Sequence, residues 1–444
     1  MGKDRRARAL AGKYEMSQCV YVADREAAAA RVQPAYVMLA ALSLINLFNF
    51  MDRMVFSVLL EPMKRDLMLS DTQMGVLGGV AFALLFGAAG LVMGRLADTR
   101  NRVRTIATVL GLWSVASALC SQAQGFAHMF LARAGVGVGT SGCSPCAHSL
   151  IADSFPPERR SLALSIFTGV GTLGTLLGLV LGGLIAEAHG WRAAFLAFAV
   201  PGILFAPCMF FLPKEPKRGT FDRAPIMRTG WLSSLRLVLR KPTARLLVLA
   251  LPLLMLTAGV GTWIPSFLQR AHDATAGDVG AYGGASIGLG LVTGTVIGGV
   301  LVDALRQRNA LWEFWWPALA TALSVPLLAL FYLADSTMLA YVALFMAFFV
   351  AGSSFGPGLA CMLVVAEPSA RGTMVALTVL CTSLIAYGFG PTFVGLFSDY
   401  LITHGFGEEN GESLRYALLA ALAFPAIGSA LFMAAARTAA SDSI

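Results

Sequence analysis

Apolar windows of about 20 residues recur along almost the whole chain, and short polar segments separate them. A helix of that length, at ~1.5 Å per residue, crosses a hydrocarbon layer ~30 Å thick, so each window predicts a transmembrane helix. The pattern predicts twelve spans, at residues 36–60, 73–93, 104–122, 126–152, 161–187, 191–212, 243–269, 278–302, 312–333, 337–365, 373–401 and 414–436.

Composition supports this reading. Of 444 residues, 57% are hydrophobic and 13% are charged, which is too little charge to cover the surface of a soluble protein. The sequence therefore predicts an all-α, multi-pass integral membrane protein, which would lie in the cytoplasmic (inner) membrane if its source is bacterial.

The basic residues are unevenly distributed. A net charge of +8 is compatible with nucleic-acid binding, but most of the 33 Lys and Arg residues lie in the N-terminal arm, in the loops after even-numbered spans and in a central linker. This asymmetry follows the positive-inside rule if the N-terminus is inside. We therefore expect both termini in the cytoplasm and no nucleic-acid partner.

The spacing of the spans divides the chain into two six-helix halves. Such a pair of halves is typical of transporters, whose substrate site lies between the halves near the middle of the membrane. The predicted segments are a cytoplasmic arm (1–34), a first half (35–212), a basic cytoplasmic linker (213–242), a second half (243–436) and a tail (437–444). Within the linker, residues 231–239 are expected to form a short helix on the membrane surface.

Two ionised residues interrupt the first span. Asp52 and Arg53 lie within the stretch NLFNFMDRMVFS, and Arg133 lies at a similar depth on the fourth span. A charge at mid-helix is unfavourable by roughly 2.5 to 3.5 kcal/mol on insertion scales, so these three residues are predicted to form the coupling and substrate site. The alternative is a salt bridge that only fixes helix packing.

Helical geometry separates the two neighbouring charges, because residues advance by about 100° each along a helix. Arg53 shares a face with Asn46 and Phe50, whereas Asp52 points to a different side. One charge can thus face a cavity while the other faces a neighbouring helix. The candidates for the cavity lining are Asn46, Asn49, Phe50, Thr140, Ser144, His148, Trp263 and Tyr387.

A charged turn follows the second span and recurs 205 residues later. Gly94-x-x-x-Asp98 precedes spaced arginines, and Gly299-x-x-x-Asp303 stands at the same point of the second half. The first copy resembles the inner-loop signature of the major facilitator superfamily, although Thr99 and Asn101 depart from it. The resemblance implies an inner gate built from Gly94, Asp98, Arg102, Asp303 and Arg306.

Further motifs resemble the spinster branch of that superfamily. They include Asn49-Phe-Met-Asp52-Arg53, Arg133 and Gly190-Trp191-Arg192, and the resemblance covers nearly all of residues 36–436. It implies a transporter of lysophospholipids or sphingoid phosphates. Spinster-like proteins commonly carry a Glu where this chain has Thr140, so proton coupling here would depend on Asp52.

The charge cluster indicates the chemistry. Two arginines and one aspartate in a largely apolar, aromatic surrounding suit an amphipathic anion, since guanidinium groups offer paired donors to carboxylate or phosphate. We expect a secondary active transporter that works by alternating access and is coupled to the proton gradient, with Asp52 exchanging between Arg133 and a proton. The alternatives are a proton-linked symporter or exchanger of small organic anions, and a membrane ligand sensor that does not transport.

Enzyme chemistry is not expected. The chain has no H-E-x-x-H or G-x-S-x-G motif. Cys143 and Cys146 form a C-x-x-C pair inside a predicted span, where redox or metal chemistry is disfavoured. We therefore expect no metal and no cofactor apart from the proton gradient, with a small-molecule or lipid substrate and membrane lipids as partners of a monomer.

Two rows of glycines are the remaining pattern. Gly171, Gly174, Gly178 and Gly182 follow each other on the fifth span, and a similar row runs along the eighth span from Gly280 to Gly298. Small faces of this kind allow helices to pack closely. Because the fifth and eighth helices lie between the halves in this superfamily, both rows are expected at the interface where the halves move.

Overall fold

The computed structural model describes residues 2–211, 215, 216, 218, 231–367, 371–408 and 410–442, with nearly all side chains from residue 34 onward. The described residues form helices and connecting segments without any strand. The side chain of Asp98 and much of the predicted linker lie outside the described part.

The first half begins with one long helix and continues through shorter ones. Its elements are α1 (Gly2–Leu67), α2 (Asp71–Gly78), α3 (Val80–Thr99), α4 (Arg102–Cys120), α5 (Phe126–Ser141), α6 (Cys143–Ser154), α7 (Pro157–Cys208) and η1 (Met209–Phe211).

The second half follows a short linker helix, α8 (Trp231–Arg240), whose position matches the predicted surface helix. The remaining elements are α9 (Pro242–Val260), η2 (Gly261–Trp263), α10 (Ile264–Ala271), α11 (Ala276–Asp278), η3 (Val279–Gly283), α12 (Gly284–Arg306), α13 (Trp312–Leu333), α14 (Thr337–Val365), α15 (Arg371–Thr382), η4 (Ser383–Phe389), α16 (Gly390–Thr403), α17 (Glu412–Ala421) and α18 (Ala423–Asp442).

The predicted spans correspond to these elements. Ten segments of the described chain are long and apolar enough to cross a membrane. One of them, within α7, contains two predicted spans, which Gly190 divides by adopting a φ of 81° that favours glycine. The fourth predicted span consists of α5 and α6, each too short to qualify by itself.

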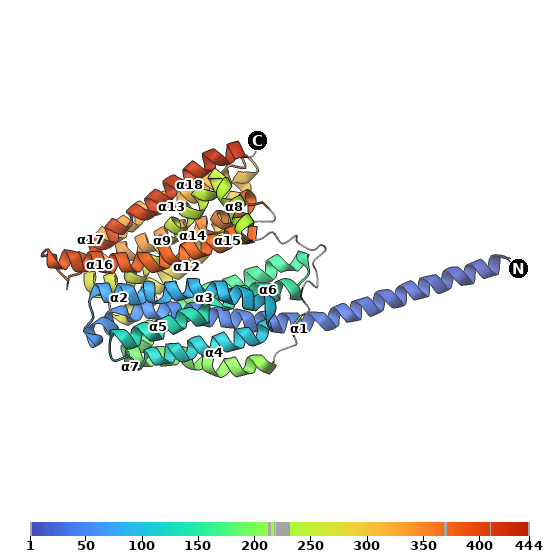
Figure 1. The fold of residues 1–444 in the computed structure, drawn as a ribbon, viewed down its shortest axis with the longest axis horizontal. Helices are drawn as coiled ribbons and strands as arrows, with labels where there is room; N and C mark the ends of the chain where they lie inside the picture. Colours follow the sequence, from blue (N-terminus) through green and yellow to red (C-terminus); the bar gives the residue numbers. More distant parts are fainter. Residues whose placement is uncertain are drawn as a thin grey trace.

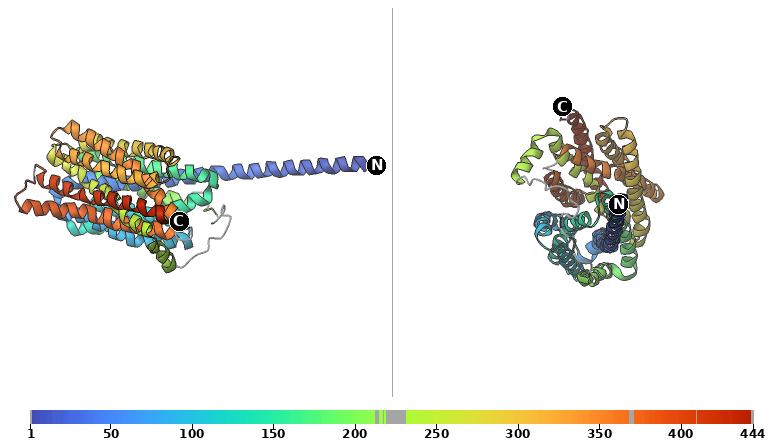
Figure 2. Two further views of the ribbon diagram at one scale, coloured as in Figure 1. Left: turned by 90° about the horizontal axis from the view of Figure 1, so that it is seen from above. Right: turned by 90° about the vertical axis from the view of Figure 1, so that its right-hand side faces the viewer.

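The helices form an elongated bundle with both termini at the same end (Figures 1 and 2). The N-terminal part of α1 projects away from that end as a continuous helix. The predicted arm at residues 1–34 is thus helical, and the apolar part of α1 that can span a membrane begins at Pro34.

The halves join tightly at one end of the bundle, which we call the closed end. Gly75 of α2 abuts the backbone of α16, where an added Cβ would lie 2.6 Å from the Pro391 carbonyl oxygen. Further along the same span, Ser383 Oγ donates to the Ala83 carbonyl oxygen at 3.0 Å. Beyond Gly87 the two helices separate, because a Cβ at Gly90 or Gly94 would meet nothing within 4 Å.

At the opposite end, which holds the termini and which we call the open end, no hydrogen bond joins the halves among the described residues. Two π-helical stretches, η3 and η4, lie along the seams where the halves meet, η3 against α7 and η4 against α3. The closed end therefore carries the described interface.

The glycine rows have different partners from those expected. On α7, a Cβ at Gly174 or Gly178 would meet carbonyl oxygens of α1 at 2.5 and 2.7 Å, so this row packs inside its own half. In the second half, Gly280 faces α7 across the interface, whereas Gly294 faces α14. The expectation that both rows lie between the halves is therefore wrong for the fifth span, because a close approach to α1 uses its small face.

Candidate functional site

Asp52 is buried within the first half. Its side chain leaves α1 toward α4 and α5 and is only 3% exposed. Ser117 of α4 donates its hydroxyl to Oδ1, while Oδ2 has no hydrogen-bond partner. A buried carboxyl oxygen without a hydrogen-bond partner is uncommon and energetically unfavourable. Oδ2 is therefore a candidate site for binding a proton.

Arg133 of α5 lies near Asp52 and is 4% exposed. Its guanidinium carbon lies 4.1 Å from the ring centre of Phe56 and 5.4 Å from that of Phe82. Its Nε has no hydrogen-bond partner, and no ion pair within 4.0 Å joins it to Asp52. The described conformation thus holds acid and base near one another without pairing them.

Arg53 points elsewhere. Its guanidinium carbon lies 4.6 Å from the ring centre of Tyr387 in the second half and 5.2 Å from that of Phe82. The side chain is half-buried, and it forms no ion pair with a described carboxylate. Arg53 therefore spans the two halves as an uncompensated cation on an aromatic surface, held by the ring quadrupoles.

Among the other predicted cavity residues, several are held within helix contacts in this conformation. Asn46 Nδ2 donates to the Phe167 carbonyl oxygen at 3.0 Å, and Thr140 donates to the Val136 carbonyl oxygen of its own helix at 2.9 Å. Trp263 is fully buried, and its Nε1 donates to the Pro391 carbonyl oxygen at 2.9 Å.

The remaining cavity candidates differ in exposure. On α1, Asn49 is buried, and Phe50 is half-buried beside Gly171 and Gly174 of α7. Ser144 and His148 are exposed on one side of α6. The His148 ring lies edge-on to Phe167 of α7, with ring centres 5.6 Å apart, so this residue also contacts the first half. A role in the cavity stays a prediction for all of them.

None of the described contacts of the predicted gate residues joins the two halves. Arg102 is fully buried and binds Asp153 and Glu215 at 2.5 Å each, so it ties α4 to α6 and to the chain after α7. Arg306 pairs with Glu313 at 2.5 Å, while Asp303 is exposed. Gly94 faces open space, and the side chain of Asp98 lies outside the described residues.

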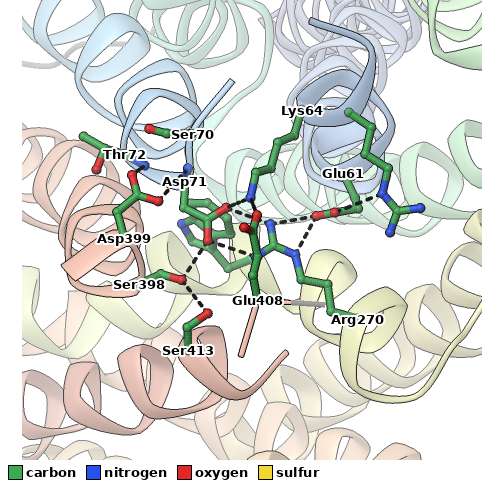
Figure 3. A network of polar contacts seen from close by, with 12 residues as sticks. Glu61, Lys64, Ser70, Asp71, Thr72, Arg270, Ser398, Asp399, Glu408 and Ser413 are labelled. Atoms are coloured by element: carbon green, nitrogen blue, oxygen red, sulfur yellow. Dashed lines mark hydrogen bonds and ion pairs between the residues drawn. The ribbon is translucent and has the colours of Figure 1, made fainter. Parts of the chain in front are cut away.

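A second group of buried charges joins the halves at the closed end (Figure 3). Arg270 of α10 grips Asp71 of α2 with two parallel bonds of 2.9 and 2.7 Å, and it binds Glu61 of α1 at 2.8 Å. Lys64 binds Asp71 at 2.6 Å and also binds Glu408. We call these five residues the closed-end cluster.

Neighbouring groups complete the cluster. Ser398 donates to the second carboxyl oxygen of Asp71 at 2.7 Å. Asp399 accepts from the backbone amides of Asp71 and Thr72 at 3.1 and 2.8 Å, so a carboxylate of the second half caps the start of α2. Burial, together with the charge of Arg415, lowers the pKa of the nearby His272 below its usual value.

Sequence reasoning missed most of this cluster. Ser70 caps α2 together with Gln73, as its position before that helix predicts. The charges of Glu61, Lys64 and Arg270, however, stand at the ends of apolar runs, where they look like ordinary loop residues. Only the fold brings α1, α2 and α10 together.

The comparisons with known proteins agree with this architecture. The family model described as Major Facilitator Superfamily matches residues 42–391. The chain belongs to the major facilitator superfamily. Within this superfamily, the solved structures that it resembles include a bacterial homologue of the human lysosomal transporter Spinster in an inward-facing, unoccupied conformation. That structure has a TM-score of 0.83 and 26% identity, over 92% of this chain and 98% of the other.

Curated relatives that the sequence matches are also named as efflux pumps, spinster homologues or transporters. An MFS-type efflux pump of Mycolicibacterium smegmatis is 30% identical over 91% of this chain and 93% of the relative. Protein spinster homolog 1 of Xenopus tropicalis is 28% identical over 88% and 78%. The sphingosine-1-phosphate transporter SPNS2 of Danio rerio is 26% identical over 92% and 86%. The chain is thus a multi-pass membrane transporter of spinster type and not an enzyme.

Proposed function

We propose that this transporter moves an amphipathic anionic lipid, such as a lysophospholipid or a sphingoid phosphate, by proton-coupled alternating access. The observation that carries the proposal is that the two neighbouring charged residues of α1 lie in different surroundings. Arg53 offers an unpaired cation at the junction of the halves, and Asp52 offers an unpaired carboxyl oxygen buried within the first half.

Arg53 suits the headgroup of such a substrate. An unpaired guanidinium presents a fork of donors that fits phosphate or carboxylate, and the rings of Tyr387 and Phe82 beside it are apolar surfaces for the adjoining chain. The name of the Danio rerio relative, which cites sphingosine-1-phosphate, supports a substrate that joins an anionic head to an apolar tail.

Asp52 suits the coupling step. In this conformation no cation pairs with the carboxyl group within 4.0 Å, and Oδ2 is free to carry a proton. In another state of the transport cycle, the Arg133 side chain turns toward Asp52 within the first half and favours the charged form, because a nearby cation stabilises a carboxylate. Proton release and substrate movement are thereby linked.

The open end faces the cytoplasm in this proposal. The N-terminal part of α1 and the linker helix α8 lie at that end, and the sequence of both segments is basic, which fits the positive-inside rule. The inward-facing bacterial spinster homologue supports the same orientation. The described conformation is then one that exchanges substrate with the inside.

The test is uptake of labelled lysophosphatidylglycerol into proteoliposomes, with and without an imposed pH gradient. Wild type should respond to the gradient, whereas Asp52→Asn should lose the response while it still binds the lipid. Gradient-driven uptake that persists undiminished in Asp52→Asn would overturn the coupling role. The absence of lipid flux in a folded wild type would overturn the substrate class.

Export is a second candidate for the direction of transport, favoured by the relative named as an efflux pump. Loading from the open end is compatible with it. Inside-out and right-side-out vesicles separate the two directions. Competition with short-chain organic anions in the same assay separates a lipid transporter from the small-anion exchanger, because only the latter would be inhibited strongly by acetate or lactate.

A further inference from the structure

Ser117 donates its hydrogen bond differently from three other buried hydroxyls of the first half. Buried Ser and Thr side chains in helices usually donate to a carbonyl oxygen three or four residues earlier in their own helix. Thr140, Ser121 and Ser141 do so here, at 2.9, 2.7 and 2.7 Å. Ser117 is completely buried on α4, yet it donates to Asp52 on another helix.

This hydrogen bond joins α1 to α4, two helices that pack mainly against other helices. α4 packs chiefly along α5 and α7, and α1 packs chiefly along α7. The Asp52 carboxyl therefore reaches out of its own packing interface to the Ser117 hydroxyl. Helix packing alone does not explain why these two side chains meet.

Among the described residues around Asp52, Ser117 is the one that donates a hydrogen bond to its carboxyl group. Arg133 stands on α5 without pairing, Arg53 points toward the second half, and the Cys120 thiol is one turn beyond Ser117 on α4. Thr140 occupies the position where spinster-like proteins commonly carry a Glu, and its hydroxyl donates to a carbonyl oxygen of its own helix. The first stabilising contact of the Asp52 carboxylate is thus a neutral hydroxyl and not a cation.

We propose that Ser117 is a positioning residue for proton coupling: it holds Oδ1 of Asp52 and leaves Oδ2 as the oxygen that binds and releases the proton. The Ser117 hydroxyl keeps its own proton throughout. A hydroxyl donor favours the charged carboxylate, but by less than an ion pair does, which leaves Asp52 able to take up a proton while Arg133 is withdrawn.

This inference rests on the proposed coupling role of Asp52, and the chain supplies a matched control. Ser114 lies one turn earlier on α4, is also buried, and faces Gly202 of α7 instead of Asp52. Ser114→Ala therefore removes a buried hydroxyl from the same helix without touching the carboxyl group.

The experiment is the pH dependence of lysophosphatidylglycerol uptake by the full-length protein in proteoliposomes. In Ser117→Ala the midpoint should move upward by about one pH unit, because the carboxylate has lost its donor and keeps the proton longer. Ser117→Thr, which retains the hydroxyl, should restore the wild-type midpoint, and Ser114→Ala should keep it. If Ser117→Ala does not fold, Ser117→Cys replaces it, since a thiol has similar size but donates weakly.

Two results would overturn the inference: an unchanged midpoint in Ser117→Ala, or a loss of rate that is equal at every pH, as a purely structural role would give. Asp52→Asn, measured in parallel, separates this failure from that of the proposed function. If Asp52→Asn abolishes the gradient response and Ser117→Ala leaves the midpoint in place, only the role of Ser117 is wrong. If Asp52→Asn retains the response, both proposals fail.

Discussion

Helix α1 contributes to two groups of buried charges, one in which the charges are paired and one in which they are not. Glu61 and Lys64 enter the closed-end cluster, where every charged group has an opposite partner and Asp71 receives two cations. About 14 to 18 Å away along α1, at a rise of ~1.5 Å per residue, Asp52 lies buried near Arg133, and the two form no ion pair.

The difference separates two uses of buried charge. Paired and hydrogen-bonded charges hold one arrangement of helices, because breaking one partner leaves another charge buried alone. Unpaired ones are unfavourable in the state that contains them and become favourable when a proton or an anion arrives. We therefore propose that the first group holds the closed end together and that the second takes part in transport.

The largest expected effect comes from Asp71→Asn. Arg270 and Lys64 would lose their shared carboxylate while remaining buried, which we expect to weaken closure by about 3 kcal/mol, or about 100-fold in the balance of conformations. Spin labels at Met68 and His404, one in each half, should report longer distances across the closed end.

The matched control is Asp66→Asn. Asp66 pairs with Arg192 at 2.6 Å near the same end, but both side chains are nearly half exposed, so the pair is worth ~0–1 kcal/mol. Its label distances should equal those of wild type. Equal distances in Asp71→Asn as well would refute the closing role of the cluster.

Arg53→Ala should act on substrate affinity and leave closure alone. Removing a charge-assisted contact to an anionic headgroup should raise KM for lysophosphatidylglycerol by about 10- to 100-fold, with the pH midpoint unchanged. Arg245→Ala, which removes an exposed arginine of α9, serves as the control. A KM that stays within about twofold of wild type in Arg53→Ala would exclude this headgroup contact.

The smallest effects distinguish the two ends of the second span. Gly75→Ala places a methyl group 2.6 Å from the Pro391 carbonyl oxygen and should destabilise the closed end by about 1 to 3 kcal/mol. Gly94→Ala meets nothing within 4 Å and should leave the label distances unchanged, with thermal stability equal or slightly raised. Similar label distances in both variants would contradict the described asymmetry between the ends.

Hydrophobic periodicity predicted the fold because each span is a local property of about 20 residues. The same logic located Asp52, Arg53 and Arg133, since a charge within an apolar run is visible without a structure. It could not identify Ser117 or Arg270, because their hydrogen-bond partners lie 65 and 199 residues away in the sequence. The glycine row of α7 was misplaced for the same reason: spacing shows a small face but not which helix covers it.

The most direct test of the central claim is proton movement itself, read from a pH-sensitive dye trapped inside proteoliposomes. Adding external lysophosphatidylglycerol without an imposed gradient should change the internal pH in wild type and in Ser114→Ala, and should leave it constant in Asp52→Asn. A substrate-dependent pH change of wild-type size in Asp52→Asn would contradict the account, because the proton would then travel by another residue.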